Sequence, residues 1–170
     1  MGLFDFSKKE EKHQEPAIKD LPSFPRRILV YIDGSEGSFH ALDLALAIAA
    51  RIPGCELSGT FVIDQASLDS LLQLHYVVEE ERNGLIEELQ EKAERTLENA
   101  RQRARDVGVT LNTYILKGRV HQAIQHAIRQ LSAELLLIGG WDNSYSHKDT
   151  TSVECQLVLD QAKCHVLVVR

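Results

Sequence analysis

The sequence has little of what marks several common classes of protein. Its three cysteines, Cys55, Cys155 and Cys164, form no CxxC pair and no zinc-ligand spacing, so we expect reduced thiols in place of a disulfide scaffold or a zinc site. Positive charge is also scarce, because 19 Lys and Arg stand against 25 Asp and Glu, for a net charge of −6. Without a basic excess to neutralise phosphates, we expect no nucleic-acid partner.

Long hydrophobic runs are absent as well. The longest strongly apolar run, 44–50, is far shorter than the ~20 residues that a membrane-spanning helix needs. The first twelve residues carry a charge cluster, Lys8 to Lys12, where a signal peptide would have an apolar stretch. These features predict a cytoplasmic protein with no membrane contact.

The chain of 170 residues has the length of one domain with a tail. Residues 1–25 hold three of the four prolines and a mixed charge cluster, which predicts a flexible N-terminal tail. The tip of the tail, Gly2 to Phe6, is an apolar exception that we interpret as a frayed terminus, with a small docking patch as the alternative. Residues 26–170 form the predicted domain.

In this domain, apolar runs alternate with amphipathic segments. The predicted strands are 28–32, 57–63, 109–116, 134–139 and 164–170. One predicted helix follows Ser35, and two others cover 120–131 and 151–162. A long amphipathic helix is predicted to start near Glu79 to Glu81 and to end at Gly108, with an apolar stripe from Ile86 to Val107. Strands that alternate with long helices predict an α/β fold with a parallel sheet and right-handed crossovers. Ligands of such folds bind at the carboxyl ends of the strands, here between the first and fourth strands.

Six ordered segments resemble the universal stress protein family. They are the strand and turn 28–36 with its Asp33-Gly34-Ser35, the first helix, Phe61 to Asp64, the helix after Gly118, the strand 133–139, and 162–169. The resemblance implies a three-layer α/β/α sandwich, Rossmann-like and of the adenine-nucleotide alpha-hydrolase type, with a five-stranded parallel sheet in the order 3-2-1-4-5. It also implies a homodimer through the C-terminal strand 165–169.

The resemblance breaks at the phosphate-binding loop. ATP-binding members carry Gly-x2-Gly-x9-Gly-[Ser/Thr], whose glycines let backbone amides approach the phosphates. Here Gly139 fills the first position, but Asp142 replaces the second glycine, and Ser152 replaces the third. A spacer one residue shorter places Thr151 at the third position instead, so two glycines are lost in either alignment. We interpret the triphosphate loop as degenerate.

The adenosine half of the family's pocket is better preserved. The resemblance assigns it to residues at the ends of three strands: Asp33, Gly34, Ser35, Val62, Gly139 and Gly140. The competing interpretation is that these residues serve only as a turn, a helix cap and strand ends. We therefore expect a non-catalytic regulatory module, not an enzyme, that has no cofactor and acts through unknown protein partners. The alternative is a regulator that binds AMP or ATP.

Histidine and cysteine add two further hypotheses. His121 and His126 lie on one predicted helix, but their spacing turns them about 140° apart, so we expect solvated side chains and not a metal pair. We expect Cys155 to be a packed structural thiol. The alternative is a thiol whose pKa is lowered by the predicted helix N-terminus nearby.

Overall fold

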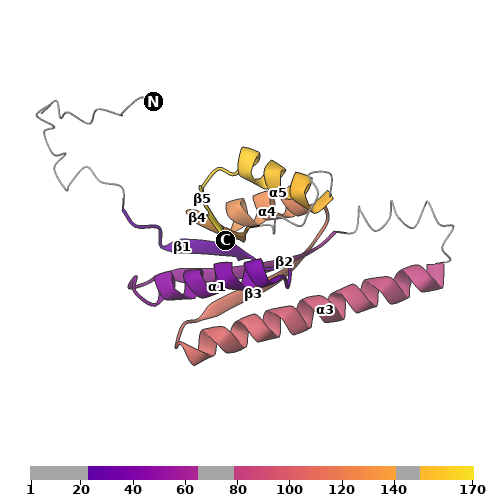
Figure 1. The fold of residues 1–170 in the computed structure, drawn as a ribbon, viewed down its shortest axis with the longest axis horizontal. Coiled ribbons are helices and arrows are strands. Elements are labelled where there is room, and N and C mark those ends of the chain that lie inside the picture. The colour runs from indigo at the N-terminus through magenta and orange to yellow at the C-terminus, as the bar shows by residue number, and fades with distance from the viewer. Residues whose placement is uncertain (1–22, 65–78, 141–149) are drawn as a thin grey trace, which may run out of the picture.

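Nine helices and strands alternate along the part of the chain that the structure describes (Figure 1). The computed structural model describes residues 23–64, 79–140 and 150–170. The elements are β1 (Arg27–Tyr31), α1 (Glu36–Ala49), β2 (Glu56–Ile63), α3 (Glu79–Asp106), β3 (Leu111–Lys117), α4 (Val120–Gln130), β4 (Leu135–Gly139), α5 (Thr150–Gln161) and β5 (His165–Val169). The predicted alternation is confirmed, whereas the predicted tail lies, as far as residue 22, outside the described residues.

The strands form one five-stranded sheet in the order β3-β2-β1-β4-β5, as the family resemblance implied. Every pairing is parallel, and β1 is the central strand, beside β2 on one side and β4 on the other. The chain moves outward from β1 to β3, then crosses back to β4 and β5. The order reverses between β1 and β4, so the carboxyl ends of these two strands flank the crevice where such folds bind ligands.

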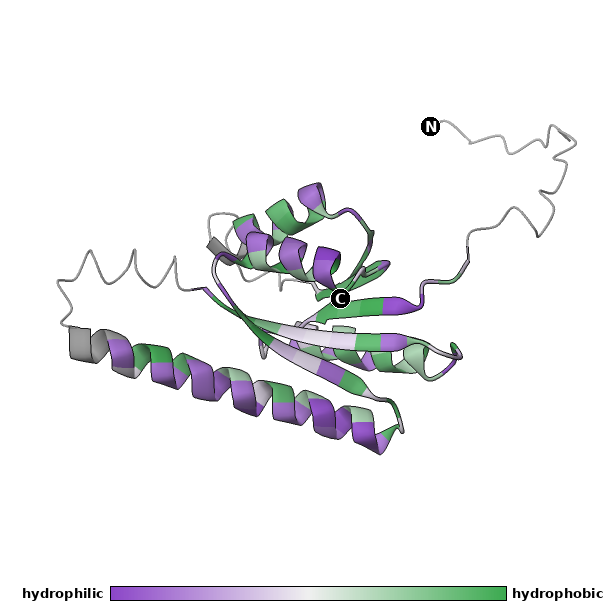
Figure 2. Ribbon diagram, turned by 180° about the vertical axis from the view of Figure 1, so that it is seen from behind, coloured by the Kyte–Doolittle hydropathy of each residue, from purple (hydrophilic) through white to green (hydrophobic). Residues whose placement is uncertain are grey.

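Helices cover both faces of the sheet, with α1 and α3 on one face and α4 and α5 on the other (Figure 1). Each face has its own hydrophobic core, and alternate residues of β1 contribute to each of the two. Ile28, Val30 and Ile32 face α1 and α3, while Leu29 and Tyr31 face the other pair of helices. This burial on both faces explains why β1 is hydrophobic from Ile28 onward (Figure 2).

Helix α3 buries one stripe of small and apolar side chains, chiefly Ala93, Leu97, Ala100 and Ala104. Hydrophilic residues alternate with these along the helix (Figure 2). The sequence predicted that Val107 would extend the stripe, but this side chain is 55% exposed. The reason is that α3 ends at Asp106, so Val107 lies in the turn that follows and not on the packed face of the helix.

The turn from β1 into α1 is specified locally. Gly34 adopts a φ of 89°, which a residue with a side chain rarely tolerates. Ser35 is the N-cap, and its hydroxyl accepts a hydrogen bond from the amide of Ser38 at 3.2 Å. The predicted capping role of Ser35 is thus confirmed. Within the described residues, no helix is both long and apolar enough to cross a membrane.

The first turn of α1 lies directly on the end of β4, and two glycines make this possible. A Cβ atom at Gly139 would lie 2.5 Å from the amide nitrogen of Ser38 and 2.6 Å from the carbonyl oxygen of Gly37. A Cβ atom at Gly37 would lie 2.8 Å from the carbonyl oxygen of Gly140. These neighbours are backbone atoms, so they have no rotamer by which to move away.

We predict that Gly139→Ala destabilises the protein by about 3 kcal/mol, at the upper end of typical overpacking costs. The added methyl group must push α1 away from β4. Gly84→Ala is the matched control, because a Cβ there meets nothing within 4 Å and alanine is a better helix former than glycine. Urea unfolding of both variants measures the difference. Equal stabilities for the two variants would contradict the close-approach argument.

Candidate functional site

The residues predicted for an adenosine pocket lie at the carboxyl ends of three adjacent strands. Asp33, Gly34 and Ser35 follow β1, Val62 lies near the end of β2, and Gly139 ends β4 with Gly140 after it. The structure therefore brings these residues to one edge of the sheet. Whether they bind a ligand stays a prediction, but several of them have identifiable structural roles.

Asp33 and the two strand-end glycines take part in local structure. The Asp33 carboxylate accepts a hydrogen bond from the amide of Ser35 at 2.8 Å, which closes the turn before α1. The amide of Gly140 donates to the carbonyl of Val169, at the end of β5. This amide is thus engaged within the sheet, whereas a phosphate-binding loop depends on amides that point toward the ligand.

Three carboxylates act on the buried end of β1. Burial raises the pKa of Tyr31 far above its usual range, and the negative charges of Asp33, Asp64 and Glu154 raise it further. Tyr31 is 8% exposed, so its hydroxyl is shielded from water. The surroundings of this hydroxyl are therefore acidic.

Cys155 is a buried structural thiol. Burial raises its pKa to about 11, and Asp33 and Glu154 add to the shift in the same direction. The expected packed thiol is confirmed, since Cys155 is buried. The alternative of a pKa lowered by the helix N-terminus is wrong, because loss of solvation and the nearby carboxylates raise this pKa.

A histidine and a glutamate form a buried pair between α4 and α5. The Glu154 carboxylate lies 2.7 Å from Nδ1 of His121 and accepts the backbone amide of His121 at 2.9 Å. The two side chains are only 12% and 10% exposed. The N-cap residue of α4, Arg119, makes no side-chain capping bond, so the carboxylate of Glu154 supplies the acceptor that the first turn of α4 needs.

The prediction of a solvated His121 is wrong, whereas His126, on the other side of α4, is exposed as expected. Sequence reasoning missed the pair because its members are 33 residues apart and belong to different helices. Among the described residues, no group of three or more His, Cys, Asp or Glu side chains is arranged to hold a metal ion. His147 of the predicted phosphate loop lies outside those residues.

Two grooves are lined by residues other than those predicted for the pocket. One, of about 480 Å³, runs between the C-terminal ends of α1 and α3. The other, of about 220 Å³, lies where β3 leads into α4, and its Leu116 is paired in register with Val62. Asp142 and the side chains of Thr151 and Ser152, the positions of the lost loop glycines, lie outside the described residues.

The sheet order, the crevice between β1 and β4 and the layered helices define a doubly wound, Rossmann-like α/β protein. The family model of the universal stress protein family matches residues 25–170. The chain belongs to this family.

Three relatives illustrate the match. Universal stress protein YxiE of Bacillus subtilis is 30% identical over 147 residues, which cover 85% of this chain and 98% of that protein. The structure of universal stress protein UspA from Lactobacillus plantarum is 26% identical and superposes with a TM-score of 0.67, covering 85% of this chain and 97% of that one. A universal stress protein in complex with cAMP is 21% identical, with a TM-score of 0.61 and coverage of 87% and 98%.

We predict that Glu154→Ala destabilises the domain by about 3 kcal/mol, because it removes one member of a buried pair and the cap of α4. Glu154→Gln keeps an amide oxygen as the acceptor, so its cost should be clearly smaller. His126→Ala, at an exposed position of the same helix, is the control and should change little. Thermal and urea unfolding measure all three variants. A Glu154→Ala variant as stable as His126→Ala would refute the capping role.

Proposed function

We propose that this universal stress protein is a non-catalytic regulatory module that acts as a homodimer through protein partners and does not bind a nucleoside triphosphate. The observation that carries the proposal is the acidic character of the crevice. Asp33, Asp64 and Glu154 all act on the buried end of β1, where the family's crevice lies. A triphosphate would add several negative charges to this edge.

The sequence of the loop supports the same conclusion. A carboxylate, Asp142, replaces a glycine where phosphate charge would lie. Like charges within a few ångströms cost several kcal/mol in a poorly solvated site. The amide of Gly140, at the start of the loop, already donates to Val169, so it offers no free donor to a phosphate.

The proposed module performs no catalytic step. Hydrolysis of ATP would need a bound metal, an oriented water and donors that stabilise the transferring phosphoryl group, whereas the proposed function needs only surfaces that bind protein partners.

The proposed homodimer uses the free edge of β5. This strand is the last of the sheet, next to β4, so its outer backbone groups can pair with a second copy. Leu167, in the middle of β5, is a large apolar side chain that is 37% exposed. The β5 strand of a second copy, related by a two-fold axis, would bury this side chain and form hydrogen bonds with the outer backbone groups of β5.

A second candidate function is a regulator that binds an adenine ligand with fewer phosphate groups. The observation in its favour is that Asp33, Val62 and Gly139 all lie at one edge of the sheet. A universal stress protein of the same fold has been solved in complex with cAMP. Such a ligand brings less negative charge to the acidic crevice than ATP does.

Calorimetry with ATP, AMP and adenosine separates the two candidates. We expect no ATP binding tighter than about 1 mM, and no phosphate release when ATP is incubated with the protein and Mg²⁺. Heat with AMP or adenosine but not with ATP would favour the second candidate. The ratio of absorbance in the nucleotide and protein bands of the purified protein checks for retained ligand. Micromolar ATP binding would overturn the proposal.

Replacing Leu167 by lysine tests the dimer. A charge at the centre of the proposed β5 contact should weaken self-association by at least about tenfold, or about 1.4 kcal/mol. Leu44→Lys is the matched control, because Leu44 lies on α1 and is 38% exposed, close to the 37% of Leu167. Sedimentation of the two variants and the unmodified protein gives the dissociation constants. A strictly monomeric unmodified protein, or equal effects of both substitutions, would refute the dimer through β5.

A further inference from the structure

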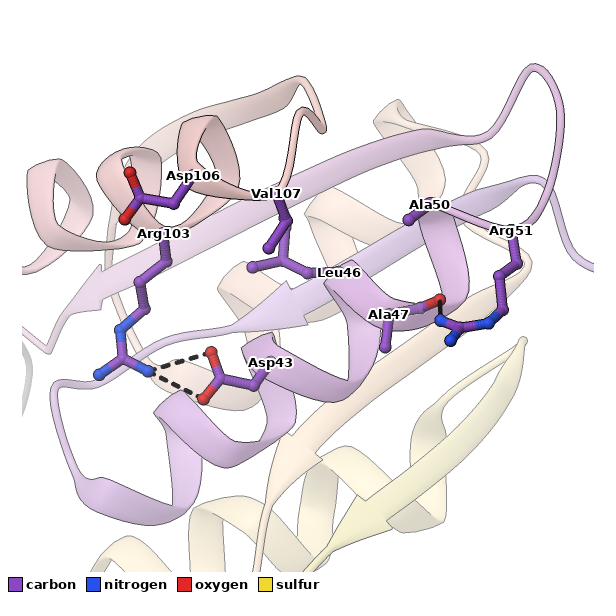
Figure 3. Close-up of a pocket in the computed structure, with 8 residues that line it drawn as sticks. All are labelled: Asp43, Leu46, Ala47, Ala50, Arg51, Arg103, Asp106 and Val107. Carbon is purple, nitrogen blue, oxygen red and sulfur yellow. Dashed lines mark hydrogen bonds and ion pairs between the residues drawn. The ribbon is translucent and has the colours of Figure 1, made fainter.

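The groove between α1 and α3 has an apolar floor and charged ends (Figure 3). Leu46 of α1 and Val107, just after α3, point toward each other in the middle of it, with Ala50 further along. Val107 is 55% exposed. Arg103 and Asp43 lie at one end and Arg51 at the other (Figure 3). An open hollow of about 480 Å³ with this lining has the size of a binding site for one or two large side chains.

The charges at the two ends differ in how they are engaged. Arg103 donates to both oxygens of Asp43, at 2.8 and 3.0 Å, and stacks over the ring of Phe39. Arg51 instead donates to a neutral acceptor, the carbonyl of Ala47, at 2.7 Å. A carboxylate is a stronger acceptor for a guanidinium than a carbonyl is. The Arg51 end of the groove therefore suits a ligand that carries a carboxylate next to apolar side chains.

The groove lies at the amino end of the sheet, where residues 1–22 join the domain. The amide of Glu56, the first residue of β2, donates to the carbonyl of Arg26 at 2.7 Å. Leu57, the next residue, is in register with Leu111 at the start of β3. Arg51 is five residues before Glu56, and Val107 is four residues before Leu111. The segment that enters β1 thus lies at the same edge as the groove.

Residues 1–22 contain one segment with the matching chemistry. Leu3, Phe4 and Phe6 are apolar, and Asp5 supplies a carboxylate between the two aromatic residues. In an extended segment, alternate side chains point to opposite sides. Phe4 and Phe6 would then share the side that faces the groove. Asp5 would lie between them on the outer side, where the long side chain of Arg51 can reach it from the rim.

We propose that residues 2–6 bind the groove between α1 and α3 of their own chain. Phe4 and Phe6 cover Leu46 and Val107, and Asp5 pairs with Arg51. From Phe6 to Ser23 the chain spans 17 residues, which reach at most ~60 Å when extended. A tether of this length gives a high effective concentration, so a contact of modest size is enough for intramolecular binding. The carboxylate of Asp106 also lines the groove and would repel Asp5. The favourable position for Asp5 is therefore at the Arg51 end.

Methyl NMR of the full chain tests the contact. If Phe4 and Phe6 cover the groove, their rings shift the methyl resonances of Val107 and Leu46, and the double substitution Phe4→Ser with Phe6→Ser removes that shift. Phe24→Ser is the matched control, since Phe24 is 79% exposed and lies outside the binding segment. The Phe24→Ser substitution should leave the methyl resonances of Val107 and Leu46 unchanged. Unchanged Val107 and Leu46 methyl resonances in the double variant would overturn the proposal.

A photo-crosslink identifies the bound surface and the chain to which it belongs. With p-benzoylphenylalanine in place of Phe4, we expect crosslinks to peptides containing Ala50 or Val107, within one chain in a mixture of ¹⁴N- and ¹⁵N-labelled protein. Val107→Glu should abolish most of this crosslink without loss of thermal stability, because the replaced side chain is exposed. Crosslinks to another surface, or only between differently labelled chains, would overturn intramolecular binding, as would a yield that Val107→Glu leaves unchanged.

Discussion

The first turn of α1 rests on the end of β4 with no side chain between the two backbones. Gly37 and Gly139 make this contact, and an added Cβ on Gly139 would lie 2.6 Å or less from backbone atoms of Gly37 and Ser38. The contact fixes the N-terminus of α1 at the point where the strand order reverses. Because densely packed elements transmit small shifts, a displacement at this contact would move the N-terminus of α1 and the Asp33–Ser35 turn relative to β4.

The order and type of the elements could be predicted because each carries a local signal. Strand β1 is apolar from Ile28 onward, Gly34 and Ser35 define the start of α1, and the stripe of α3 has helical spacing. The buried pair of His121 and Glu154 could not be predicted this way. Each residue alone is polar and close to a helix start, and only the packing of α4 on α5 places one beside the other.

The two strand-end glycines of the predicted pocket show a second limit of prediction from sequence. A strand-end glycine followed by a second glycine is compatible with ligand binding and with close packing. The structure identifies packing contacts for both: Gly139 touches α1, and Gly140 bonds to Val169 next to Arg170. Sequence shows which residue types are present at a strand end. It does not show which neighbouring backbone occupies the space that the missing Cβ leaves.

The two ends of the sheet differ in chemistry, and the difference follows from the topology. At the carboxyl end, the residues that leave β1 and β2 and enter α5 are acidic, and three of their carboxylates raise the pKa of one buried tyrosine. At the amino end, the groove between the C-terminal ends of α1 and α3 combines Leu46, Ala50 and Val107 with charged side chains such as Arg51. An acidic edge disfavours phosphate, whereas a partly apolar groove with a guanidinium at its rim favours an aromatic and acidic peptide segment.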